Sequence, residues 1–156
     1  MSRTFLDSAA TNLVNPRVIN VAKNFTDMIS DKSRTTSDVF REQQASLGVG
    51  RRAVAHFLGC DASEIALMQS TSHSLGTLSQ CLPLEKGDNV LICDLEYQAS
   101  VVCWQAAMEK KGFELREVKT KNGQITAEDF EKYIDARTKV ILLAAVQEIN
   151  GYRADV

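Results

Sequence analysis

The stretch "KVILLAAV", residues 139–146, decides the fold class because nearly every residue in it is apolar. A continuous apolar run, in contrast to an alternating one, is typical of a parallel strand that is buried on both faces of its sheet. Upstream, strand-like segments at 64–69, 89–94 and 113–119 alternate with helical segments at 72–82, 99–112 and 126–135. Helices between strands predict βαβ units. We therefore expect the α/β class, with a mostly parallel sheet and helices on both faces.

Two helices are expected before this alternation begins. The first covers residues 16–30, because Asn15 and Pro16 suit the cap and the first position of a helix. The second covers residues 37–58 and ends at Gly59, a residue type that commonly follows the last turn of a helix.

Composition places the chain among ordinary soluble globular proteins, with 156 residues, a net charge of −2 and 44% hydrophobic residues. No long run of Lys and Arg marks a nucleic-acid surface, and no apolar run is long enough for a membrane span or a secretory signal. We expect a cytoplasmic protein. Residues 1–35 are predicted to form an N-terminal arm and helix, and residues 36–156 to form part of a large domain that continues beyond this sequence.

The sequence does not indicate a metal site, a dinucleotide-binding site or an acid–base pair of carboxylates. Four cysteines, at 60, 81, 93 and 103, and two histidines, at 56 and 73, lack the spacing of metal ligands, so we expect free thiols and no metal site. "GVGRRA", residues 48–53, resembles a dinucleotide-binding fingerprint, but it follows a helical segment and not a strand. "DLEYQ", residues 94–98, holds two carboxylates at a strand end, a pattern too common to indicate an acid–base pair.

The stretch "MQSTSHSLGT", residues 68–77, places several hydroxyl side chains where a strand should give way to a helix. A helix N-terminus carries unpaired N–H groups and suits a phosphate. Thr71 and Ser72 would add hydroxyl donors to those N–H groups. The alternative is an ordinary Ser/Thr helix cap without a ligand.

Two further strand ends favour a ligand. Tyr97 follows one expected strand, and Gln147, Glu148 and Asn150 follow the next. Ligands of such sheets bind outside the carboxyl ends of the strands. An aromatic ring beside a phosphate site therefore indicates a flat, phosphorylated cofactor.

Four stretches, in the right order and spacing, resemble the class V aminotransferase family of fold-type I pyridoxal-phosphate enzymes, which includes cysteine desulfurases and selenocysteine lyases. They are "FLDSAATN", "RRAVAHFLGCDASEIALMQSTSHSL", "LEYQASVVCWQ" and "VQEINGYRADV", and together they extend over nearly all of the chain. The resemblance implies pyridoxal 5'-phosphate as the cofactor and a small amino acid as the substrate.

The resemblance also implies roles for particular positions. The cofactor-binding candidates are Thr71 and Ser72 for the phosphate, Tyr97 for stacking on the pyridine ring, and one of Gln147, Glu148 or Asn150 near the phenolic oxygen. Counting back from Gly151 favours Glu148, whereas matching the Val-Gln pair favours Gln147. The candidates for the substrate carboxylate are Ala9, Ala10 and Thr11.

Two departures from the family pattern matter. Desulfurases carry histidine at the stacking position, where it also transfers protons, whereas Tyr97 is a poorer acid–base group near neutral pH and favours an aminotransferase, lyase or epimerase. The Schiff-base lysine and the aspartate that pairs with the ring nitrogen match positions beyond Val156. We therefore expect no catalytic residue here, and an activity that needs a missing segment or a second chain to supply the lysine. The resemblance also implies a homodimer or an assembly with that second chain. The alternative is a non-catalytic binding or assembly module derived from the same fold.

Overall fold

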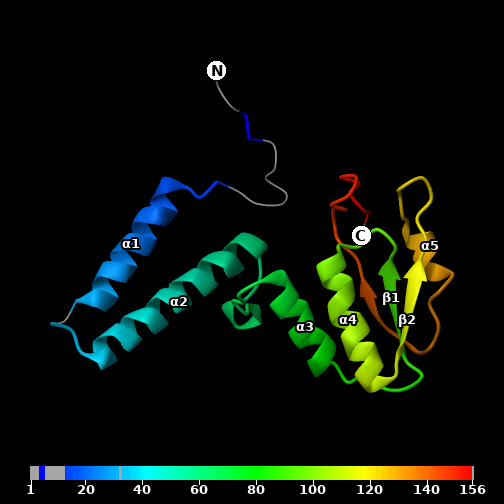
Figure 1. Ribbon diagram of the computed structural model, residues 1–156, viewed down its shortest axis with the longest axis horizontal. Helices are drawn as coiled ribbons and strands as arrows, with labels where there is room; N and C mark the ends of the chain where they lie inside the picture. Colours follow the sequence, from blue (N-terminus) through cyan, green and yellow to red (C-terminus); the bar gives the residue numbers. More distant parts are fainter. Residues whose placement is uncertain (1–3, 6–12, 32, 156) are drawn as a thin grey trace. The chain divides into compact units, whose positions relative to one another are not determined.

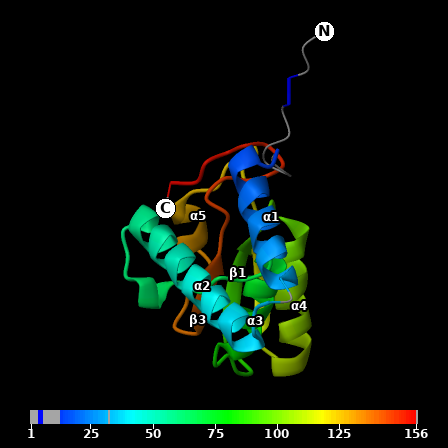
Figure 2. The ribbon, with the colours of Figure 1, turned by 90° about the vertical axis from the view of Figure 1, so that its left-hand side faces the viewer.

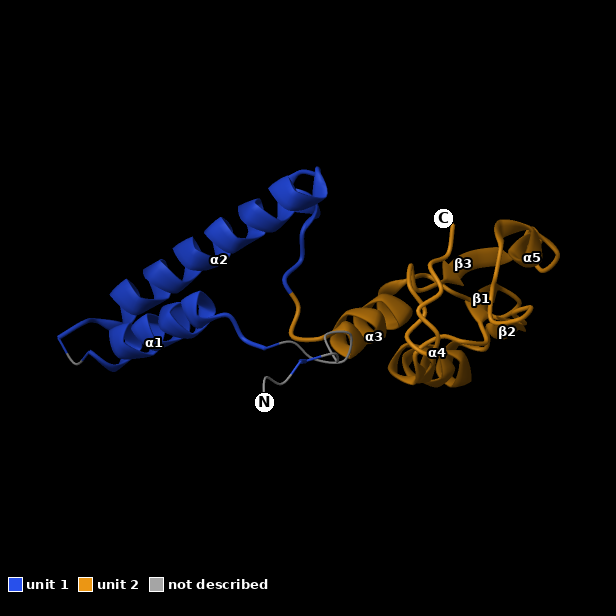
Figure 3. Cartoon of the chain, turned by 90° about the horizontal axis from the view of Figure 1, so that it is seen from above, with its two compact units in different colours: residues 1–67 blue, residues 68–156 orange. Residues whose placement is uncertain are grey.

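The computed structural model describes residues 4–5, 13–31 and 33–155. The chain divides into two compact units, Met1–Leu67 and Met68–Val156, which Figure 3 colours separately. No helix in the described ranges is both long and apolar enough to cross a membrane. Ala9, Ala10 and Thr11 lie outside the described residues, and the expected division at residue 35 into functional domains stays a prediction.

Unit 1 is helical. Its described elements are α1 (Pro16–Ser30), α2 (Thr36–Leu58) and a short 3-10 helix, η1 (Ala62–Glu64) (Figure 1). Both long helices were expected from the sequence, and each begins at a side-chain cap. Asn15 accepts a hydrogen bond from the Arg17 backbone N–H at 2.9 Å, and Thr35 caps α2 through a capping box with Asp38.

Unit 2 holds the sheet. Its elements are α3 (Thr71–Cys81), β1 (Asn89–Cys93), α4 (Gln98–Lys111), β2 (Glu114–Val118), α5 (Ala127–Glu131) and β3 (Thr138–Leu142). The strand order is β2-β1-β3, and β1 runs parallel to both of its neighbours. The α/β class with a parallel sheet is therefore confirmed.

Helices cover both faces of the sheet in unit 2 (Figures 1 and 2). On one face Val90 packs with Trp104 and Ala107 of α4, and on the other Leu91 packs with Phe130 of α5. Every residue of β1 is buried, which explains why this central strand consists mainly of apolar residues.

Two sequence expectations about strands were wrong. Residues 64–69 form no strand: η1 ends at Glu64 and the chain that follows is irregular, without a neighbouring strand to pair with. The strand expected over 139–146 ends early, at Leu142, and is only half-buried, with Ile141 46% exposed. This strand lies at the edge of the described sheet, and an open groove of about 290 Å³ separates its Ile141 from α5.

Candidate functional site

The helices α3 and α4 bring their N-termini to the same end of unit 2. Near their starts the Cys103 thiol lies 3.5 Å from the Ser72 carbonyl oxygen, and near their ends the Lys111 ammonium donates to the Leu82 carbonyl oxygen at 2.6 Å. Since these contacts pair start with start and end with end, the two helices run in the same direction. Because α4 starts just after the carboxyl end of β1, both helix starts lie at the carboxyl end of the parallel sheet, where α/β proteins bind ligands.

The start of α3 carries free donors. Ser70 is the cap, since its hydroxyl oxygen accepts from the His73 N–H at 3.1 Å. Thr71 and Ser72 follow it, and neither their N–H groups nor their hydroxyl groups donate to a partner among the described residues. An exposed helix start with unused donors and a partial positive charge suits an anion. Capping by Ser70 leaves the two predicted phosphate residues available.

Tyr97 occupies the cap position of α4 but supplies no side-chain cap. Its carbonyl oxygen accepts from the Ser100 N–H at 2.8 Å, which fixes the backbone at the helix start. The side chain is 55% exposed. Tyr97 therefore presents an aromatic face at the same end of unit 2 as Thr71 and Ser72.

The three polar candidates in the loop after β3 differ in their side-chain contacts. Gln147 is buried, and its side-chain amide donates to the Glu96 carboxylate at 3.3 Å. Asn150 donates to the Gly123 carbonyl oxygen at 2.7 Å and so holds a neighbouring turn. Glu148 is exposed, and its carboxylate accepts no hydrogen bond among the described residues. Of the three, Glu148 alone makes no side-chain hydrogen bond among the described residues.

Sequence reasoning missed Glu96. It considered the carboxylates of "DLEYQ" only as an acid–base pair, whereas Glu96 accepts hydrogen bonds from the loop after β3. The one available signal was its place directly before Tyr97.

The four cysteines are free thiols, as predicted. Burial raises the pKa of Cys93, the one fully buried member of the four. Cys103 lies beneath the start of α3, where its sulfur contacts backbone carbonyl oxygens of Ser72 and Ala99. These two thiols therefore behave as packing groups.

Several lysines of unit 2 bind partners away from the candidate site. Lys121 and Lys132 bind Asp129, and Lys119 pairs with Glu117. Within the described part of the chain, no lysine forms a hydrogen bond or ion pair with Thr71, Ser72 or Tyr97.

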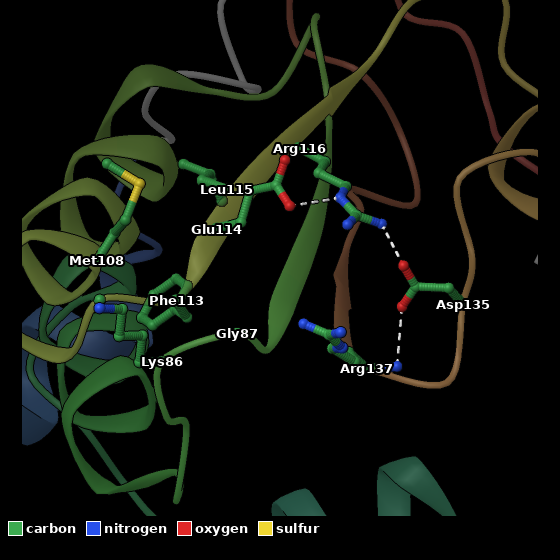
Figure 4. Close-up of a pocket in the computed structure, with 10 residues that line it drawn as sticks. Lys86, Gly87, Met108, Phe113, Glu114, Leu115, Arg116, Asp135 and Arg137 are labelled. Carbon is green, nitrogen blue, oxygen red and sulfur yellow. Dashed lines mark hydrogen bonds and ion pairs between the residues drawn. The ribbon is translucent and has the colours of Figure 1, made fainter.

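A wide hollow of unit 2, about 700 Å³, lies elsewhere. It opens at the amino ends of the strands, where Arg116 joins Glu114 at 2.8 Å and Asp135 at 2.7 Å (Figure 4). Neither Thr71 nor Tyr97 lines it. Ligands of parallel sheets bind at the opposite, carboxyl end, so size alone does not make this hollow the functional site.

Unit 2 is thus an α/β unit with an exposed helix start and an exposed aromatic ring at the carboxyl end of its sheet, an arrangement that suits a phosphorylated cofactor. A sequence profile of the aminotransferase class-V family matches residues 4–156, so the chain belongs to that family. This agrees with the resemblance noted in the sequence.

Relatives of this chain are named cysteine desulfurases. A probable cysteine desulfurase of Vibrio cholerae is 26% identical over 158 residues, which cover 97% of this chain and 39% of the relative. The cysteine desulfurase of Haloferax volcanii is 25% identical over 94% of this chain and 36% of its own length. The chain thus spans well under half the length of these relatives.

Solved structures share the fold. The cysteine desulfurase CsdA of Escherichia coli has a TM-score of 0.81 at 22% identity and is matched over 96% of this chain and 39% of its own. The cystine C–S lyase C-DES, in complex with cysteine persulfide, has a TM-score of 0.83 at 14% identity over 90% of this chain and 38% of its own. A mutant of C-DES carries glycine covalently linked to its pyridoxal-phosphate cofactor.

Proposed function

We propose that this chain forms the cofactor-binding part of a pyridoxal-phosphate-dependent enzyme that acts on an amino acid, of the cysteine desulfurase, selenocysteine lyase or aminotransferase type. The observation that carries the proposal is the meeting, at one end of unit 2, of a helix start with unused donors and an exposed aromatic ring. Membership of the aminotransferase class-V family supports it. Pyridoxal phosphate bound there would supply an electron sink for bond breaking in the amino acid.

Each residue of the proposed site acts through a simple contact. The N–H and hydroxyl groups of Thr71 and Ser72 bind the phosphate, and the positive end of α3 adds to the attraction. The Tyr97 ring stacks on the pyridine ring and excludes water from that face. Glu148 lies near the phenolic oxygen, because Gln147 and Asn150 already bind protein partners.

The anchoring lysine and the residue that pairs with the ring nitrogen are proposed to come from polypeptide outside this sequence, in the same chain or in a second one. The engagement of Lys119, Lys121 and Lys132 elsewhere supports this, as does the greater length of the relatives. We further propose a cytoplasmic homodimer, with Ala9, Ala10 and Thr11 near the substrate carboxylate. Tyr97 in place of a proton-transferring histidine favours a reaction other than desulfuration.

A second candidate is a non-catalytic binding module. The absence of a lysine from the described site favours it, because a phosphate ligand can bind there without covalent anchoring. The two candidates differ in whether the site recognises the pyridine ring or only the phosphate.

The test is a titration of the ¹⁵N-labelled chain with pyridoxine 5'-phosphate, which lacks the aldehyde and so does not react with surface lysines. We expect saturable shifts of the Thr71 and Ser72 amide signals, and of the Tyr97 ring. Inorganic phosphate should move only the two amides, and pyridoxine should bind more weakly than its phosphate.

Substitution of Thr71→Val together with Ser72→Ala should weaken phosphate binding several-fold, since the hydroxyl donors are lost while the backbone donors remain. The matched control is Thr77→Val on the same helix, whose hydroxyl already donates to the His73 carbonyl oxygen at 2.8 Å. Shifts that are equal for inorganic phosphate and pyridoxine phosphate would favour the binding module. No saturable shift at residues 71–72 would exclude both functions.

A further inference from the structure

Two carboxylates at the end of β1 reach in opposite directions. Asp94 accepts a hydrogen bond from the Thr120 N–H, just after β2, at 3.1 Å. Glu96 accepts one from the Ala144 N–H, just after β3, at 2.5 Å. Because the strand order is β2-β1-β3, these two hydrogen bonds connect the segment after the central strand to the segments after both of its neighbours.

Glu96 uses one carboxylate oxygen for two bonds. The oxygen that binds the Ala144 N–H also accepts from the side-chain amide of Gln147 at 3.3 Å. Gln147 is 1% exposed, so this contact is shielded from water. A hydrogen bond to a charged acceptor is stronger than a neutral one, and shielding strengthens it further.

The orientation of the Gln147 side-chain amide depends on Glu96. Its carbonyl oxygen is buried and has no hydrogen-bond partner among the described residues. Turning the amide over would place that oxygen against the Glu96 carboxylate, where two acceptors would repel. In the observed orientation the Gln147 amide keeps its hydrogen bond to Glu96, while its buried carbonyl oxygen stays unpaired, which is uncommon in proteins.

The contacts of Glu96 also restrain the backbone of Tyr97, the next residue in the chain. On one side its backbone is fixed by the start of α4, through the Ser100 N–H. On the other side lies Glu96, whose own N–H donates to the Cys93 carbonyl oxygen at 3.1 Å. The exposed ring itself makes no hydrogen bond among the described residues, so its place depends on the backbone that carries it.

We propose that Glu96 is a positioning residue, which holds the Tyr97 ring in place by tying the loop after β1 to the loop after β3. What the ring then binds rests on the function proposed above, but the tie itself does not. Glu96 touches no ligand in this role.

The first readout is the Tyr97 ring without any ligand. The chain has three tyrosines, so fluorotyrosine labelling should give three ¹⁹F signals, and Tyr97→Phe identifies the one of interest. Glu96→Ala should broaden or shift the Tyr97 signal and leave that of Tyr133 in place. Glu96→Gln should restore it, because an amide oxygen can still accept both bonds.

The second readout separates positioning from general damage. Glu96→Ala should weaken binding of pyridoxine 5'-phosphate about tenfold, as the loss of a charge-assisted hydrogen bond predicts. Binding of inorganic phosphate at α3 should not change. Glu109→Ala, at an exposed position of α4, is the matched control and should match the native chain in both assays.

An unchanged Tyr97 signal in Glu96→Ala would overturn the proposal, and so would equal losses of phosphate and pyridoxine phosphate binding. If the native chain bound no pyridoxine phosphate at all, the proposed function would fail. The fluorine comparison of the Ala and Gln variants would still decide the role of Glu96.

Discussion

The two units of this chain are stabilised in different ways. In unit 2 the side chains of β1 are buried on both faces, and Trp104 and Phe113 meet edge to face within one of its two apolar clusters. Among the described residues of unit 1, Ala55 alone is buried, whereas large apolar side chains of α1 and α2, such as Val21 and Phe57, are mostly exposed. Unit 2 therefore depends on contacts between distant parts of the sequence, and the helices of unit 1 depend on local signals.

The largest difference in stability between the two units is expected when one apolar side chain is removed from each. Leu91→Ala deletes a fully buried side chain of β1 and should lower the free energy of unfolding of unit 2 by about 2–5 kcal/mol. Val21→Ala, at a position that is 67% exposed, should change stability by less than about 0.5 kcal/mol. Urea unfolding followed by the fluorescence of Trp104, which lies in unit 2, measures the first variant, and unfolding followed by helical circular dichroism measures the second.

A loss above about 1 kcal/mol in Val21→Ala would contradict the comparison, because such a loss requires burial that the structure does not give this side chain. Val90→Ala is a second buried variant, from the opposite face of β1, in case Leu91→Ala does not fold.

The same difference explains how much of the fold the sequence predicted. Both long helices of unit 1 were found to within a residue, because caps such as Asn15 and Gly59 are local signals. The strand expected at 64–69 was wrong, because apolar alternation cannot say whether a partner strand lies beside it. Just beyond the early end of β3, the Ala144 N–H donates to the Glu96 side chain, a distant contact that no local pattern around residue 144 reveals.

The candidate site follows the same rule. The sequence placed Thr71, Ser72 and Tyr97 at helix starts, and the structure has them there, while their contacts with a cofactor stay predictions. It could not separate Gln147, Glu148 and Asn150, because their side-chain directions depend on Glu96 and on the turn at Gly123. These side-chain directions become apparent only when the loops that follow the strands are seen side by side in the folded structure.

A smaller effect is expected from equivalent caps in the two units. Thr35 caps α2 and Thr126 caps α5, each through a capping box with the aspartate three residues later. Each Thr→Ala variant should destabilise its helix by about 1 kcal/mol. Thr126→Ala should lower the urea midpoint seen by Trp104, whereas Thr35→Ala should reduce helical circular dichroism without moving that midpoint. A common shift in both variants would show that the units unfold together.

The smallest effect concerns the charges at the amino ends of the strands. Hydrogen bonds from Arg116, and then from the Arg137 N–H and the Asn89 side chain, lower the pKa of Asp135 to about 2. A pKa below the unfolded value means that the ionised carboxylate stabilises the fold. This contribution is complete above about pH 4 and is lost as the pH falls toward the folded pKa. Since the Asp135 side chain is 46% exposed, solvent screens the pair and limits its contribution.

Asp135→Asn should therefore lower the Trp104 midpoint slightly near neutral pH, and the two curves should converge as the pH falls from about 5 toward the folded pKa of about 2. Asp38 in unit 1 is the comparison, because the Thr35 side chain also lowers its pKa although the group is exposed. Asp38→Asn should leave the midpoint of unit 2 unchanged at every pH. Parallel curves for the native chain and Asp135→Asn would mean that the ion pair does not stabilise unit 2, whose stability would then rest on apolar burial.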